Sequence, residues 1–480
     1  MHCVIKKLVL PLLIAALAPA VMGFSLLGPF KPWQVTAIGY NISGNEIGAP
    51  MELPAAYRWN VTNVTYAFDE SFIKYFGTNG MKAVDDAFAI LNNLPPASRI
   101  NLDDYPLDTK LQNYTAYQAG ILDIKSITMT MMMFEMGLAE PERWVWCLRG
   151  RNTETIGGVT YTNYLVIKQN YDPYTLKPSS IVNGVTYTYQ IQDPIAPQNY
   201  ADAIESPVGV SERLAYSSVA SGTLLPGDFY FGLSRDDVGG IKFLLSTNNL
   251  AVEGVLTNVT GNILGAGAFG WVPWFGGTNA VLTTNFFNTT NLAGLTNGSN
   301  FVAVGLRGGG NKITFTKVYY DSLLGSAFQP ITNGYLDNVL VTNKLIQQRL
   351  QRVISQPDIV FVAEDLGLFN NIDPFLTATT GTAGWVNNDA INGLATAGGP
   401  GVIQGQVRLS FTTLLPYFLN QTPNQLGEIF YNPVLNLSVG TVWGSFDHTA
   451  KPPIIYPEYM NLTVEDLLGL LSRYTNSIPR

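Results

Sequence analysis

After removal of a predicted leader, the 480-residue chain keeps one cysteine, Cys147, and one histidine, His448. A single cysteine allows no intrachain disulfide, so the fold must be held together by its core. A chain of this length can do so, because the buried fraction of the surface grows with size. Hydrophobic residues make up 46% of the sequence and charged residues 13%. This balance predicts extensive apolar burial, either in a large core or against other subunits.

Residues 1–23 have the pattern of a secretory signal peptide. Two lysines precede an apolar run over residues 8–18, and small residues follow, which places the cleavage site before Phe24. The run is too short to cross the roughly 30 Å of bilayer hydrocarbon, and no later stretch is long and apolar enough. We therefore expect a secreted or cell-surface protein without a transmembrane anchor.

Charge and residue types exclude several classes of function. The formal net charge of −8 does not suit binding to nucleic acid or to anionic lipid. With so few histidines and cysteines, the mature chain cannot build a His-rich zinc site, and His448 is its one histidine base. The composition disfavours an enzyme but leaves open whether the protein is catalytic.

The fold class expected from the sequence is an α+β N-terminal domain followed by a β-rich, antiparallel sandwich-like C-terminal domain. A shift towards Asn, Thr and Gly falls near residues 247–255 and separates the two parts. The expected divisions are a signal peptide over 1–23, an extended lead-in over 24–56, an α+β domain over 57–250, and a β-rich domain over 251–480 that ends in a helix.

Hydrophobic periodicity and turn signals predict individual elements within these parts. The expected elements are a strand over 57–68, a helix capped by Asn79, a helix over 116–136, strands over 159–168 and 185–191, a turn at Asn183-Gly184, a capped helix opening at Ser234, and a final helix capped by Thr463. The run 340–354 fits a helix or a strand. The methionines near 129–133 and the thiol of Cys147 are expected to be core groups.

Two segments of the first half carry a resemblance to a known family. The stretch Trp59–Asp69 with the helix expected at 80–92, and Leu233-Ser-Arg-Asp-Asp-Val-Gly-Gly-Ile-Lys-Phe-Leu-Leu, resemble the opening and the post-active-site segment of matrixin-like metzincin proteases. That family carries an H-E-x-x-H-x-x-G-x-x-H zinc helix between them. The interval here contains no histidine, and Glu205 and Glu212 lie in no such motif. Over residues 57–245 the resemblance therefore implies a protease-like scaffold without the metal.

Two small groups of residues could carry acid–base chemistry. Asp447 and His448 lie close to Ser445 in sequence, but neighbours on one strand seldom point at a common atom, and no G-x-S-x-G elbow is present. Glu364 and Asp365 end the apolar run 359–363, and a glycosidase needs only two suitably spaced carboxylates. These four residues are the candidate catalytic groups.

Binding groups are sparse in the sequence. No cofactor is expected apart from calcium, whose oxygen ligands occur in the Asp/Asn-rich loops 101–108 and 370–373, although neither loop has EF-hand spacing. Trp271 and Trp274 suit a sugar platform or a loop anchor. The partners that remain are a second copy of the chain and a surface glycan.

Three hypotheses of function follow. The first is an exported, non-enzymatic structural or surface-interaction protein that self-associates through apolar, Asn/Thr-rich faces. The second is a secreted carboxylate-dependent glycan hydrolase. The third is a metal-free, protease-like binding module.

Overall fold

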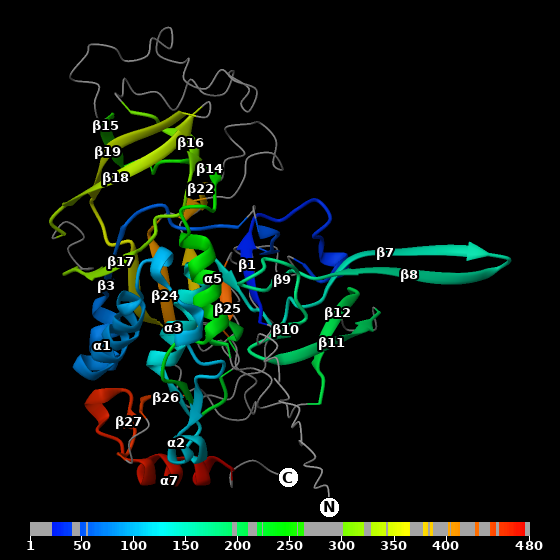
Figure 1. Ribbon diagram of the computed structural model, residues 1–480. Helices are drawn as coiled ribbons and strands as arrows, with labels where there is room; N and C mark the ends of the chain where they lie inside the picture. The colour runs from blue at the N-terminus through cyan, green and yellow to red at the C-terminus, as the bar shows by residue number, and fades with distance from the viewer. Residues whose placement is uncertain are drawn as a thin grey trace, which may run out of the picture.

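The computed structural model describes residues 22–40, 49–53, 56–193, 199–209, 218–222, 224–256, 258–263, 301–320, 328–341, 344–364, 378–382, 385–386, 402–403, 405–412, 428–431, 442–447 and 451–475. The body of the molecule packs helices against a central sheet, and a long hairpin projects from it (Figure 1). The α-helices are α1 (Glu70–Asn93), α2 (Tyr114–Gln118), α3 (Ile124–Glu135), α5 (Arg235–Leu245) and α7 (Val464–Thr475).

The central sheet draws its strands from both halves of the chain. Its order is β17-β3-β20-β24-β21-β25. The bounds are β3 (Asn63–Phe68), β17 (Thr314–Lys317), β20 (Ile359–Glu364), β21 (Ala378–Thr382), β24 (Val407–Thr412) and β25 (Glu428–Tyr431). The first four strands in the order run parallel, whereas β21 and β25 are antiparallel to their neighbours. The two strands that flank β3 thus come from more than 240 residues further along the chain.

A second sheet is antiparallel and has the order β14-β16-β18-β19-β15. Its bounds are β14 (Ala251–Gly254), β15 (Val259–Ile263), β16 (Val304–Arg307), β18 (Ile331–Val341) and β19 (Lys344–Ile354). The ambiguous run 340–354 is therefore mostly strand. Residues on β18 and β19 alternate between buried and exposed, as expected for a sheet with one face on the body and one in water.

Short strands complete the described part of the chain. A four-stranded sheet contains β1 (Phe24–Gly28), β2 (Ala49–Pro50), β6 (Leu138–Ala139) and β9 (Asn170–Tyr171). Two three-stranded sheets contain β5 (Ile121–Asp123), β26 (Val442–Ser445) and β27 (Ile454–Ile455), and β10 (Ile181–Val182), β11 (Val185–Gln192) and β12 (Asp202–Pro207). Three two-stranded sheets pair β4 (Lys110–Gln112) with β13 (Asp228–Tyr230), β22 (Trp385–Val386) with β23 (Val402–Ile403), and β7 (Cys147–Ile156) with β8 (Val159–Ile167).

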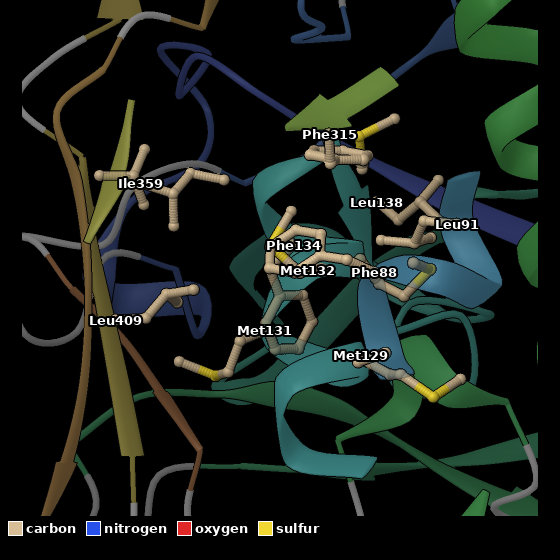
Figure 2. Packing of buried hydrophobic residues seen from close by; sticks show 14 of the residues in the cluster. Phe88, Leu91, Met129, Met131, Met132, Phe134, Leu138, Phe315, Ile359 and Leu409 are labelled. Carbon is tan, nitrogen blue, oxygen red and sulfur yellow. The ribbon is translucent and has the colours of Figure 1, made fainter. Parts of the chain in front are cut away.

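The core lies between the central sheet and helices α1 and α3. Phe72, Phe76 and Phe88 of α1 are buried and form aromatic contacts with one another or with strand residues such as Phe361. In α3 the methionines of residues 129–133 are fully buried, as the sequence predicts. Figure 2 shows Met131 and Met132 among the surrounding aliphatic and aromatic side chains.

Buried ion pairs join the body to the antiparallel sheet. Arg58 Nε lies 2.6 Å from Glu253 Oε1, and both side chains are almost fully buried. Arg58 also donates to the carbonyl of Arg307, whose guanidinium pairs with Asp337. Because breaking such a pair leaves a buried charge without its partner, the network fixes how β14, β16 and β18 sit on the body.

The strand-rich, mixed α and β character expected from the sequence is confirmed, including several antiparallel sheets. The division into two domains at residue 250 is not confirmed, because β3 lies between β17 and β20 in one sheet. The lead-in expected over 24–56 contains the strand β1. Its strand β1 is buried throughout, and Gly23 N donates to Asp236 Oδ2 at 2.8 Å.

Two helices differ from their predicted bounds. The first begins at Glu70, capped by Asp69, and has non-helical dihedral angles at Gly77, close to the predicted start at Asn79. The predicted helix over 116–136 is wrong as a single element. It is divided into α2 and α3 around the positive φ of Gly120 and the strand β5, which pairs with the distant β26.

Candidate interaction surface

The predicted Ser-Asp-His group is only partly within the described chain. Ser445 ends β26, and its Oγ lies 2.8 Å from the hydroxyl of Tyr456. Burial raises the pKa of Tyr456, so this partner is a phenol that stays protonated rather than a base. Asp447 follows β26 in the described part, while His448 lies outside the described residues. The Ser445 hydroxyl is therefore held by a structural hydrogen bond.

The predicted carboxylate pair is also incomplete. Glu364 is the last residue of β20 and is opposite Thr412 of β24, and nothing is described of its side chain. Asp365, the loop 370–373 and both Trp271 and Trp274 lie outside the described residues. A glycan-cleaving pair is not assembled from the predicted residues within the described part of the molecule.

The Asp/Asn-rich loop 101–108 uses its oxygens for local capping. Asn101 Oδ1 accepts from Asp103 N, and Asn101 Nδ2 donates to Asp104 Oδ1 at 3.0 Å. Asp108 Oδ1 accepts from Lys110 N at 2.9 Å. Across the described ranges, no three His, Cys, Asp or Glu side chains gather into a cluster fit for a metal ion.

A cluster of buried carboxyl groups was not predicted as a unit. Asp237 at the start of α5 accepts from the Oγ atoms of Ser218 and Ser234 and from three backbone N–H groups. Next to it, burial raises the pKa of Glu142 well above its ordinary value, and the nearby charges of Asp237 and Asp236 raise it further. The Asp236 pKa is likewise raised by burial. Only the capping box Ser234–Asp237 had a local signal in the sequence.

Cys147 has the surroundings expected of an inert core thiol. Its side chain is fully buried, and burial raises the pKa of the thiol to about 12. The ring of Tyr40 stacks on Trp144, and the guanidinium of Arg143 lies 4.4 Å from the centre of the Trp144 ring. Because the thiolate is the nucleophilic form, a thiol with this pKa is unreactive near neutral pH.

This buried region anchors a projecting hairpin, formed by β7 and β8, which we call the arm. The arm extends away from the rest of the molecule in Figure 1. Ten residues of β7 correspond to about 30 Å of strand. Its turn is Gly157-Gly158, and both residues have positive φ, which a two-residue hairpin of this kind requires.

The base of the arm is held by polar as well as apolar contacts. Arg151 donates to both carboxylate oxygens of Asp193, from Nε at 2.6 Å and from Nη2 at 3.1 Å. Tyr164, which is opposite Arg151 in the register, packs against the cluster around Cys147. At the base of the arm, the face that carries Arg151 and Tyr164 therefore contacts the body.

The two faces of the arm differ in chemistry. The register places four large apolar side chains on one face, each between 52% and 59% exposed: Ile156, Val159, Tyr161 and Leu165. We call this the apolar face. The opposite face carries threonines, including Thr155 and Thr160, whose hydroxyls lie 3.2 Å apart. Apolar and polar side chains alternate in this way along antiparallel strands of which one face packs against another surface and the other faces water.

Comparison of the chain with protein-family models, with characterised proteins and with solved structures gives no significant match. None of the helices that the structure describes has the length and apolar character needed to cross a bilayer. The exposed apolar side chains of the arm are suited to contact with another surface.

Proposed function

We propose that this protein is an exported, non-catalytic structural or surface protein that associates with further copies of itself through the arm. The observation that supports this proposal is the gathering of Ile156, Val159, Tyr161 and Leu165 on one exposed face. The glycan-hydrolase and protease-like hypotheses remain predictions without a matching site in the described residues.

The limited stability of the arm on its own supports this proposal. An isolated two-stranded hairpin is marginally stable in water, and among the described strands β7 and β8 pair only with each other. Its apolar face also leaves four large side chains half in water. Covering their exposed halves contributes roughly 3–6 kcal/mol in total, on the scale of 1.5–3 kcal/mol for a fully buried side chain. A partner surface therefore stabilises the arm and the assembly together.

A change of the apolar face tests this proposal. The variant replaces Ile156, Val159, Tyr161 and Leu165 together by Thr, which keeps high strand propensity while it removes most of the apolar surface. We expect the wild-type chain to elute as a species heavier than its 52.4 kDa mass in size exclusion with light scattering. The variant should elute as a monomer.

A matched control changes the other face of the same arm. Replacing Thr153, Thr155, Thr160 and Thr162 by Ser keeps the hydroxyls and leaves the apolar face intact. This control should associate like the wild type. If the apolar-face variant associates as strongly as the wild type, the arm is not the associating surface and the proposal is wrong.

A further inference from the structure

A second exposed face has a composition that complements the arm. On the outer side of β18 and β19, Leu336, Leu345 and Val353 are 54%, 64% and 41% exposed. The register places Leu336 directly opposite Arg349, and Leu345 opposite Leu340. We call this surface the β18–β19 outer face. The inner side of the same two strands carries buried residues such as Leu350 and Arg352, so the body packs against the inner side.

Each of the two faces contains one charge without a partner. Glu154 is opposite Tyr161 on the apolar face of the arm, and Arg349 is opposite Leu336 on the β18–β19 outer face. Both side chains are exposed. Among the described residues, neither forms an ion pair or a side-chain hydrogen bond. One apolar surface thus offers a lone acid, and the other offers a lone base.

We propose that the arm of one copy lies on the β18–β19 outer face of a second copy, with Glu154 paired to Arg349. This inference rests on the proposed function and specifies the surface that receives the arm. Figure 1 shows the arm at the right of the molecule, whereas the strands β18 and β19 lie in the sheet at its upper left. The two faces therefore meet between copies rather than within one copy.

Charge also argues against the simplest alternative, in which two arms pair with each other. The apolar face consists of Gly150, Asn152, Glu154, Ile156, Val159, Tyr161, Asn163 and Leu165. It contains no cation, so an arm-on-arm contact would enclose two Glu154 carboxylates without a counter-charge. A carboxylate removed from water without a partner is costly. Contact with the β18–β19 outer face gives both Glu154 and Arg349 an opposite charge.

The predicted contact joins two different surfaces, so each copy uses its arm on one neighbour and receives an arm from another. Such a head-to-tail contact repeats, and it forms a ring if the rotation closes and an open chain if it does not. Arm-on-arm pairing would instead stop at a dimer. The size distribution of the assembly therefore distinguishes the two arrangements.

Charge reversal tests the inference on the full chain. We expect E154R and R349E each to weaken association by about tenfold or more in apparent Kd, because each places two like charges at the contact. The double variant E154R/R349E restores the opposite charges in reversed order and should associate within a few-fold of the wild type. Sedimentation velocity over a concentration series measures all four proteins.

The matched control is R99E, which reverses an exposed arginine that ends the 3-10 helix Ala97–Arg99 and belongs to neither face. It should associate like the wild type. If E154R weakens association and R349E does not, the arm binds another surface, and the inference is wrong while the proposed function stands. If the double variant associates as weakly as the single variants, Glu154 does not pair with Arg349 and the inference is wrong. If the wild type is monomeric throughout, both proposals fail.

Discussion

At the scale of single residues, the most demanding environment is that of the buried carboxyl groups around α5. Both carboxyl oxygens of Asp237 accept hydrogen bonds, from five donors in all. Glu142 is different, because one of its carboxyl oxygens, Oε2, is buried without a hydrogen bond, and its raised pKa follows from burial. The sequence could not reveal this residue, since the loop at 218–220 and α5 reach it from about 75 and 95 residues away.

The raised pKa of Glu142 predicts how stability depends on pH. The folded state holds the Glu142 proton more tightly than the unfolded chain, whose carboxyl titrates near 4.5. This contribution is therefore fully present below pH 4.5 and is lost as pH rises through the folded pKa. Glu142→Gln removes the titration, so the variant should have a higher unfolding free energy than the wild type at neutral pH and a weaker dependence of that free energy on pH.

Urea unfolding at several pH values measures this effect. The control is Glu52→Gln, which changes a half-exposed carboxylate 3.1 Å from Lys31 and should leave the pH dependence nearly unchanged. A Glu142→Gln variant that is less stable than the wild type at neutral pH, with the same pH slope, would show that the carboxyl is ionised and satisfied in the folded state.

At the scale of elements, local signals predicted local structure. The Asn183-Gly184 turn, the capping box at Ser234 and the Thr463 cap of α7 are all present, because each depends on residues within a few positions. The prediction of a single helix over 116–136 was wrong because the break in it depends on a contact between residues far apart in the sequence. Its break contains β5, whose partner β26 lies more than 300 residues away. The arm strands were predicted in part, but their isolation from other sheets could not be.

The turn of the arm gives a prediction at this scale. Gly158 has φ of +83°, which an L-residue rarely adopts, and no atom lies near the position of its missing Cβ. Gly158→Ala should therefore cost about 1–2 kcal/mol by backbone strain alone. We expect faster hydrogen exchange of the arm amides while the melting temperature of the body stays unchanged.

Gly150 provides the control within the same hairpin. A Cβ at this position would meet only Leu165 Cβ at 3.9 Å, an ordinary contact, and the φ of Gly150 is not positive. Gly150→Ala should therefore leave exchange in the arm unchanged or slower. Equal exchange in the two variants would mean that the turn does not set the stability of the arm.

At the scale of the whole molecule, both halves of the chain contribute strands to the central sheet. Two different apolar surfaces, the arm and the β18–β19 outer face, are exposed. The central position of β3 between β17 and β20 could not be derived from local patterns, because parallel neighbours so distant in sequence leave no local signal. The composition predicted extensive apolar burial, either in a large core or against other subunits. The structure has a large core and also exposes apolar side chains on the arm and on the β18–β19 outer face.

Self-association can be read from the mass of the wild-type chain in solution. Light scattering over a dilution series should give a mass that rises with concentration above the 52.4 kDa of one chain. Head-to-tail contact predicts growth beyond a dimer. A constant mass of one chain at every concentration would show that the protein does not self-associate.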